Sequence, residues 1–343
     1  MDAALFGAAL SLAPRVGRVR YRELLDRLGD HESAFREAAG NAERDELIAG
    51  GRALVARASA VGAQVLAYGS RSYPARLREL ADPPQLLFAC GRLEWLDERP
   101  VVAIVGTRAA TAYGERVTRE IAGQLARAGA LVLSGMARGI DAAAHRGALG
   151  AGGRTGAVLG TGIDIAYPAA HRALHAELAT RGLLLSEQPP GEKASGGSFP
   201  ERNRIIAALA DLVIVGEAPV KSGALITAAR ALELGRTIAA VPGAIDSPQS
   251  AGSNELLRDG AQCIATPADA LALVGRTAPP RAPAREVQGP DRAVWDALGR
   301  GALDLDTLAS TTALPAREVL AAVTRLELSG AVECALTGEI RRR

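Results

Sequence analysis

Several residue types that often indicate a function are scarce in this chain. Its only cysteines are Cys90, Cys263 and Cys334, which are far apart, odd in number and fit no metal-ligand spacing. They exclude a disulfide framework and favour a reducing, cytoplasmic compartment. No apolar run reaches the roughly 18 residues of a membrane span, and the N-terminal apolar patch lacks the basic residues that precede a secretory signal. We therefore expect a cytoplasmic protein that has no membrane contact.

Lysine and aromatic residues are also rare. Lys193 and Lys221 are the only lysines, and aromatic residues make up 3% of the chain. The net charge of +2 does not indicate a polyanionic partner by itself. The few aromatic side chains are informative by their position, because Tyr113, Tyr167 and Phe199 lie in or beside glycine-rich loops and not in apolar runs.

A repeated pattern of short apolar runs and glycine-rich loops organises the middle of the chain. The first run, VVAIV, stops at Gly106 and is followed by an amphipathic segment. This alternation predicts an α/β fold with a doubly wound, Rossmann-like parallel sheet. Ligands bind at the carboxyl ends of such strands, so the loops should share one crevice. The predicted strands lie near 101–106, 130–133, 156–160, 183–186, 212–216, 237–241 and 262–264.

Smaller parts are predicted on either side of the sheet. Residues 1–65 predict a small helical module, either SAM-like or helix-hairpin-helix-like with a nucleic-acid contact, or a packing module alone. The extended sheet domain spans 66–275, and 276–290 form a Pro-rich linker. Residues 291–343 predict three helices and a strand pair, a winged helix whose third helix is as suited to protein contact as to DNA reading.

The loops of the sheet domain carry groups that suit phosphate. Backbone N–H groups at helix N-termini attract anions, and arginine presents a planar fork of donors. Several such groups along one edge suggest a row of phosphates. The candidates are Arg108, Arg138, Arg202, Arg204 and Lys221, with Ser134, Gly135, Ser222 and Gly223 as sources of hydroxyl and amide donors.

Some of these residues have a structural alternative. Arg202 and Arg204 suit ion pairs with a neighbouring helix as well as phosphate contacts. Asn203 between them suits a base contact or a helix cap. Phe199 lies in a Gly- and Ser-rich loop, where an aromatic ring gains little from burial, so a base-stacking platform is a natural use.

Signatures of catalysis are missing. The loop at Gly106 lacks the further glycines of a dinucleotide fingerprint, and no P-loop or GxSxG motif occurs. Asp141 and His145 are spaced i, i+4, but without a third ligand a structural hydrogen bond is the default over metal or acid–base use. Asp164 and Glu217 suit sugar hydroxyls or loop caps. We expect no cofactor, no metal, no catalytic residue, and binding in place of catalysis.

The order of these motifs resembles one family. The segments GTRAATAYG, SGMARGIDAAAHRGAL, SFPERNRIIAAL and EAPVKSGALITAARALELGR follow one another through the sheet domain as in the DprA/Smf (DNA-processing protein A) family. The upstream segment SYPARLRELADPPQLLFACG also resembles that family. The resemblance therefore covers most of the chain.

This resemblance implies a non-enzymatic protein that binds single-stranded DNA and loads the RecA recombinase onto incoming DNA in natural transformation and recombination. It also implies a homodimer formed through the sheet domain, and a DNA site in the loops 106–108, 134–141 and 199–204. Lys221 and Ser222 are added to this site because of their positive charge and hydroxyl group, and not because of the resemblance. The expected site residues are Gly106, Thr107, Arg108, Ser134, Gly135, Arg138, Gly139, Phe199, Arg202, Asn203, Arg204, Lys221 and Ser222.

Two other functions remain open from the residues alone. One is an enzyme or sensor that holds a small nucleotide at the loop after Gly106. The other is a winged-helix regulator that binds duplex DNA through residues 291–343.

Overall fold

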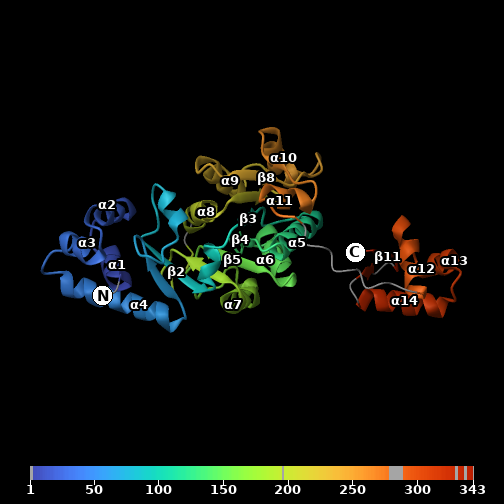
Figure 1. Cartoon of the computed structure of the whole chain (residues 1–343), viewed down its shortest axis with the longest axis horizontal. Coiled ribbons are helices and arrows are strands. Elements are labelled where there is room, and N and C mark those ends of the chain that lie inside the picture. Colours follow the sequence, from blue (N-terminus) through green and yellow to red (C-terminus); the bar gives the residue numbers. More distant parts are fainter. Residues whose placement is uncertain (1–2, 195–196, 278–288, 329–330, 336–337, 343) are drawn as a thin grey trace. The chain divides into compact units, whose positions relative to one another are not determined.

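The chain forms two compact units, Met1–Pro279 and Pro280–Arg343 (Figure 1). Most of the predicted Pro-rich linker lies outside the described residues and stays a prediction. The computed structural model describes residues 3–194, 197–277, 289–328, 331–335 and 338–342.

A nine-stranded sheet with the order β1-β2-β6-β5-β4-β3-β7-β8-β9 is the centre of the first unit. Strands β3 to β9 are parallel to one another and match the seven predicted strands, which confirms the Rossmann-like sheet. Their bounds are β3 (Val101–Val105), β4 (Leu131–Ser134), β5 (Arg154–Leu159), β6 (Leu183–Ser186), β7 (Leu212–Val215), β8 (Thr237–Ala240) and β9 (Gln262–Cys263).

Helices cover both faces of this sheet. Figure 1 shows α8 and α9 on one side and α6 and α7 on the other. The alternation of β3 explains the two layers, since Val101 and Val105 pack toward α8 and α9 whereas Val102 and Ile104 pack toward α5 and α6. The helices are α5 (Ala112–Arg127), α6 (Ile140–Gly150), α7 (Arg172–Arg181), α8 (Ser198–Leu209), α9 (Gly223–Glu233), α10 (Ala251–Arg258) and α11 (Pro267–Leu273), with short 3₁₀ turns η2 (Leu93–Leu96), η3 (Ala169–His171) and η4 (Pro248–Ser250).

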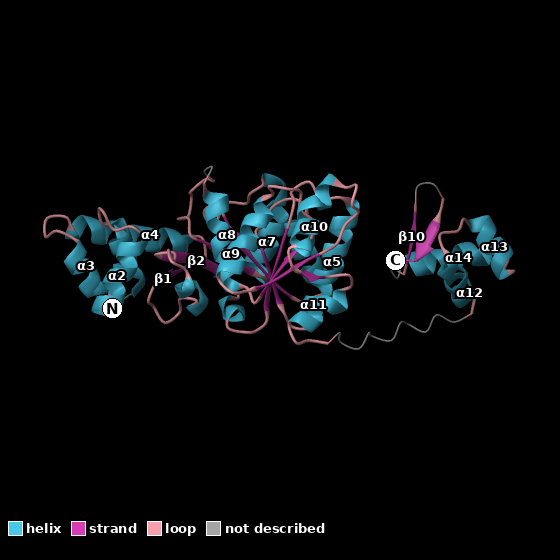
Figure 2. Ribbon diagram, turned by 90° about the horizontal axis from the view of Figure 1, so that it is seen from above, coloured by secondary structure: helices cyan, strands magenta, loops and turns pink. Residues whose placement is uncertain are grey.

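Two antiparallel strands join the sheet to the N-terminal helices. Strand β2 pairs with β6 on one side and with β1 on the other. Figure 2 shows β1 and β2 between the helices α1 to α4 and the rest of the sheet. The elements are α1 (Ala3–Leu12), α2 (Arg18–Leu28), α3 (His31–Ala38), α4 (Arg44–Ala60), β1 (Gln64–Ala67), η1 (Ala75–Glu79) and β2 (Leu86–Gly91).

The direction in which strands are added reverses at β3. Strands β4, β5 and β6 follow on one side of β3, whereas β7, β8 and β9 follow on the other. The connections that follow β3 and β7 therefore run in opposite directions, and a crevice forms between them at the carboxyl ends of the strands. The amide of Thr107 donates to the carbonyl of Glu217 at 2.7 Å, which ties the two loops together.

The second unit is a winged helix, which confirms that prediction. Three helices pack around Val294, Leu308 and Val319, and β10 pairs with β11 in an antiparallel wing. Within the described parts of the chain, no helix is both long and apolar enough to cross a membrane. The elements of this unit are α12 (Pro290–Ala297), η5 (Leu298–Arg300), α13 (Leu305–Thr312), α14 (Ala316–Leu328), β10 (Val332–Cys334) and β11 (Ile340–Arg342).

Candidate nucleic-acid interface

Two adjoining cavities lie at the carboxyl ends of β3, β4 and β7. Their volumes are about 470 and 410 Å³, and both are lined by Arg108, Ala137, Phe199 and Arg202. Because they share this wall, we treat them as two lobes of one strand-end groove. The predicted site residues that line the groove are Gly106, Thr107, Arg108, Gly135, Arg138, Phe199, Arg202, Asn203 and Ser222.

An arginine and two aromatic rings meet where the lobes join. The guanidinium carbon of Arg108 lies 5.1 Å from the ring centroid of Phe199, and the ring of Tyr167 lies 5.1 Å from it on a tilted plane. Arg108 is exposed and forms no ion pair with any described residue. A guanidinium that rests on a ring face keeps its N–H edge available for phosphate. Tyr167 is absent from the predicted site residues, although its position in the loop after β5 was a signal.

Arg202 lies beneath the groove. Only 6% of its surface is exposed, and its Nη1 donates to the carbonyls of Gly135 (2.7 Å) and Val158. Burial lowers the pKa of Arg202 to about 10, which leaves the guanidinium charged at neutral pH. The ion pair with a neighbouring helix, which was the structural alternative for Arg202, does not form among the described residues; its guanidinium bonds backbone carbonyls of the sheet domain.

Asp141 holds the loop after β4 from the helix side. Its carboxylate accepts hydrogen bonds from the amides of Gly135 (3.1 Å) and Ala137 (3.2 Å). Burial raises the pKa of the Asp141 carboxyl, and the Arg202 charge and the two amides act against that rise. The loop is thus braced from below while Arg138 stays exposed at the groove, without an ion pair to a described residue.

His145 also has a structural role. Its Nδ1 lies 2.7 Å from the hydroxyl oxygen of Thr155, and burial lowers the pKa of the ring to about 3, so the ring is neutral. Among the described residues, no three His, Cys, Asp or Glu side chains gather where a metal ion would bind. The hydrogen-bond interpretation of Asp141 and His145 therefore describes both side chains.

Ser134 and Gly139 shape the same loop and do not line the groove. The Ser134 hydroxyl is buried and donates to the carbonyl of Ile104 at 2.6 Å. Gly139 has a φ of +68°, and a Cβ there would come within 2.4 Å of the carbonyl oxygen of Thr107. A larger residue would strain the backbone and push the two loops apart.

The N-terminus of α9 forms the opposite wall. The Ser222 hydroxyl caps this helix by accepting from the amide of Ala224 at 3.3 Å, and Asn203 Nδ2 donates to the carbonyl of Gly223 at 3.3 Å. Asn203 lies inside α8, so the helix-cap alternative is wrong for this residue. Lys221 does not line the groove, but it is exposed next to Ser222 and forms no ion pair with a described residue.

The two acidic residues that suited sugar hydroxyls are loop braces. Glu217 is buried, and its carboxylate accepts from the amide (2.7 Å) and the hydroxyl (2.8 Å) of Thr111. Asp164 accepts from the amide of Gly191 at 2.9 Å. The loop-cap interpretation therefore describes both.

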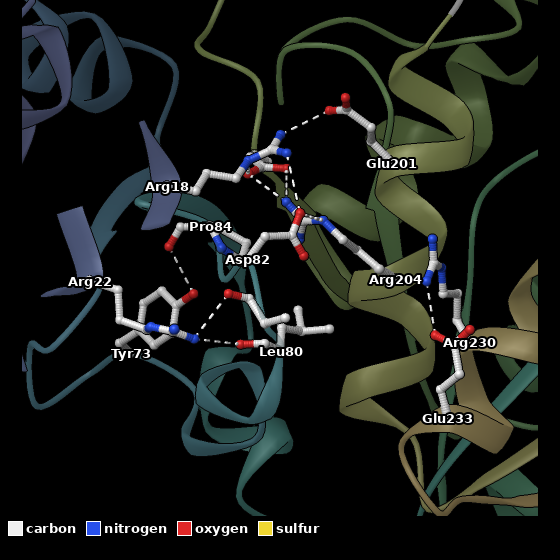
Figure 3. Close-up of polar contacts among 12 residues, drawn as sticks. Arg18, Arg22, Tyr73, Leu80, Asp82, Pro84, Glu201, Arg204, Arg230 and Glu233 are labelled. Carbon is white, nitrogen blue, oxygen red and sulfur yellow. Dashed lines mark hydrogen bonds and ion pairs between the residues drawn. The ribbon is translucent and has the colours of Figure 1, made fainter. Parts of the chain in front are cut away.

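Arg204 points to the other side of α8. Its Nη2 donates to both carboxylate oxygens of Glu187 at 2.8 Å, and its Nε lies 3.2 Å from Asp82 (Figure 3). The ion-pair alternative is therefore what the structure shows for Arg204. Arg18, from the helical module 1–65, bonds the same Glu187 at 2.9 Å, as the packing alternative for that module predicts.

Comparisons with known proteins point to one family. The family model described as DNA recombination-mediator protein A matches residues 64–275, and the DprA winged helix domain matches 278–335. A Mycobacterium tuberculosis protein that carries the DprA name is 41% identical over 330 residues, which are 92% of this chain and 84% of that protein. DNA processing protein DprA of Streptococcus pneumoniae is 44% identical over 204 residues, or 58% of this chain and 70% of that protein.

Two solved structures extend the likeness to the fold. DNA processing protein A of Streptococcus pneumoniae has a TM-score of 0.68 and 34% identity, covering 79% of this chain and 98% of that one. DNA processing protein A of Helicobacter pylori, studied for its single-stranded DNA binding mode, has a TM-score of 0.55 and 35% identity, covering 60% of this chain and 92% of that one. The resemblance noted from the sequence is confirmed, and this chain belongs to the DprA/Smf family of DNA recombination-mediator proteins.

Proposed function

We propose that the strand-end groove binds single-stranded DNA and that the chain acts by binding, without catalysing a reaction. The observation that carries this proposal is the exposed guanidinium of Arg108 on the ring of Phe199, at the junction of the two lobes. The two adjacent side chains offer a cation for a phosphate and an aromatic face for a base. Those are the two groups that a single strand presents in alternation.

The charges of the groove support a polyanionic ligand. Arg108, Arg138 and Lys221 are exposed in or beside it, and none of the three is neutralised by an ion pair with a described residue. The carboxylate that lines the groove, Asp141, is buried and already accepts two backbone hydrogen bonds. The potential over the groove is therefore positive, although the net charge of the chain is only +2.

The aromatic rings favour a single strand over a duplex. Tyr167 and Phe199 lie in contact at the groove, where a base stacks on a ring only when it has left its own stack. Bases in a duplex are paired and stacked, and their faces are hidden. The related Helicobacter pylori protein binds single-stranded DNA, which agrees with this choice.

We further propose that the chain loads the RecA recombinase onto single-stranded DNA during natural transformation and recombination, and that it forms a homodimer through its sheet domain. Apolar side chains in this part of the sheet domain are available to a protein partner: Val220, just before α9, is 51% exposed, and Leu232, near the end of α9, is 69% exposed. Sedimentation of the wild type and of Leu232→Glu tests the dimer. A monomeric wild type contradicts it.

Titration of three ligands tests the DNA proposal. Labelled oligo(dT), a duplex of equal length and thymidine mononucleotide are each titrated against the wild type, Arg108→Ala and a control, Arg127→Ala. Arg127 is also exposed, but it lies at the far end of α5. We expect oligo(dT) to bind best, Arg108→Ala to weaken it about tenfold, and Arg127→Ala to leave it unchanged.

Two results would contradict the proposal. Strong binding of the mononucleotide with no gain for the oligomer would favour a nucleotide enzyme or sensor. Tight, sequence-dependent duplex binding that Arg108→Ala leaves intact would favour a role for the winged helix. A recombinase-loading assay, in which RecA filaments form on protein-coated single strands, then tests the mediator step.

A further inference from the structure

Helix α8 makes different contacts on two of its sides. One side carries Phe199, Arg202 and Asn203, which line the strand-end groove. The other side carries Glu201 and Arg204, which point toward the N-terminal helical module (Figure 3). Glu201 and Arg204 are three positions apart in the chain, so their side chains lie on one face of the helix. Because the helix moves as one body, contacts that hold this face also determine the position of the face that lines the groove.

Arg18, at the start of α2, holds that face. Its guanidinium bonds carboxylates from three different segments: Glu187 at 2.9 Å, Glu201 at 2.8 Å and Asp82 at 3.4 Å. Its side chain is 30% exposed, and the Arg18 bond lowers the pKa of Glu201. Hydrogen bonds to charged groups are stronger and more directional than neutral ones. Arg18 therefore links the helical module, the segment after β6 and the first turn of α8.

The Arg18 cluster, composed of Arg18, Asp82, Glu187, Glu201 and Arg204, does not resemble a phosphate site. Its two arginines face three carboxylates, and Arg204 bonds Glu187 and Asp82. The adjoining cavity of about 600 Å³ is lined by two further acidic side chains, Glu79 and Glu233, and by one further arginine, Arg230, which pairs with Glu233. An excess of negative charge repels DNA. The cluster is therefore not a direct DNA contact, and its link to the groove is the position of α8.

We infer that Arg18 is a positioning residue for single-stranded DNA binding, because it fixes Glu201 and thereby the first turn of α8 that carries Phe199. Only Pro200 separates Phe199 from Glu201, and the ring of Pro200 restricts its φ. A displacement of Glu201 therefore also displaces the aromatic ring of Phe199. The N-terminal module would thus contribute to DNA binding without touching DNA. The inference rests on the proposed function of the groove.

The direction of the change in affinity separates position from charge. If the Arg18 cluster acted through its electric field alone, Arg18→Ala would weaken oligo(dT) binding and Glu201→Gln, which removes a negative charge, would strengthen it. If the cluster positions α8, both variants weaken binding, by about three- to tenfold. Opposite effects of the two variants would overturn the inference.

Two neighbouring arginines provide matched controls. Arg22 lies one turn further along α2 and donates to the carbonyls of Ala81 (2.9 Å) and Leu80 (3.4 Å), so Arg22→Ala loosens the same module without touching α8 (Figure 3). Arg230 lines the same cavity as Arg18 and pairs with Glu233 on α9, so Arg230→Ala removes an equal charge. We expect both controls to bind oligo(dT) within about twofold of the wild type.

A double-mutant cycle identifies the group through which Arg18 acts. In a Phe199→Ala background, Arg18→Ala should cause no further loss of affinity, because the ring that it positions is gone. Additive losses would overturn the inference. The salt dependence of binding should also be unchanged by Arg18→Ala, whereas a lost phosphate contact would reduce the slope of log affinity against log salt by about 0.7.

Folding and the proposed function are tested alongside. Thermal unfolding checks each variant, and if Arg18→Ala does not fold, Glu201→Gln carries the sign test alone. Arg108→Ala separates the two levels. If Arg108→Ala weakens binding and the Arg18 and Glu201 variants do not, the inference fails while the DNA proposal stands. If no variant changes oligo(dT) binding, the DNA proposal itself fails.

Discussion

The guanidinium carbon of Arg108 lies 5.1 Å from the centre of the Phe199 ring, although 91 positions separate the two residues in the chain. The loop after β3 supplies the cation, and the first turn of α8 supplies the ring. Each restrains the other, since a stacked guanidinium loses fewer orientations when it binds a phosphate.

Charge and planarity of Arg108 should be separable. We expect Arg108→Ala to weaken oligo(dT) binding about tenfold and to reduce the salt slope by about 0.7, the value for one single-strand phosphate. Arg108→Lys should keep the slope but recover only part of the affinity, because an ammonium does not stack flat on Phe199. Fluorescence titrations at several salt concentrations measure both. Full recovery by lysine would contradict a role for the stacked geometry.

Phe199 should act without charge. Phe199→Ala is expected to cost about 1–3 kcal/mol of binding free energy, the range for one stacked base, with an unchanged salt slope. Phe199→Tyr keeps the aromatic face and should bind nearly as well as the wild type. The same titrations measure this. A change of slope as large as that of an arginine variant would contradict the stacking role.

Alanine variants of Arg202 and Arg138 should differ in their unfolding free energy. Arg202→Ala removes a buried cation that bonds the carbonyls of Gly135 and Val158, so we expect the first unit to lose about 3 kcal/mol or more of unfolding free energy. Arg138 is exposed, so Arg138→Ala should weaken DNA binding with stability nearly unchanged. Denaturant titration measures the difference. Equal stability of both variants would contradict the bracing role of Arg202.

His145 should make stability depend on pH. Burial lowers the pKa of this ring from an ordinary value near 6.5 to about 3, so the folded chain holds it neutral. Below pH 6.5 the unfolded chain binds a proton that the folded chain does not, and stability falls as the pH decreases toward 3. At pH 5 the loss attributable to His145 is about 2 kcal/mol.

The matching variant is His145→Gln, which cannot titrate. Its unfolding free energy should decrease less than that of the wild type between pH 7 and pH 5, whatever its stability at pH 7. Chemical denaturation at the two pH values measures this difference. Parallel decreases in both proteins would show that the ring is not held neutral in the folded state.

The amino-acid sequence alone determined the sheet, its seven parallel strands and the edge of the sheet at which the site residues gather. These features depend on local signals: β-branched runs that stop at glycine, and amphipathic segments that follow. The sequence also identified Arg108 and Phe199 as candidates from their glycine-rich surroundings. The loop predicted for Phe199 is wrong, because this residue lies in the first turn of α8.

Only the tertiary structure decided which side each residue of α8 faces. Arg202 and Arg204 are separated by one residue, yet one braces the loop after β4 through carbonyls and the other bonds carboxylates near β2 and β6. Successive helix positions are rotated by about 100°, so their partners depend on what the sheet places on each side of the helix. The sequence contains the arginines. The packing of the helix against the sheet and the N-terminal module determines which of them remain free to meet a phosphate.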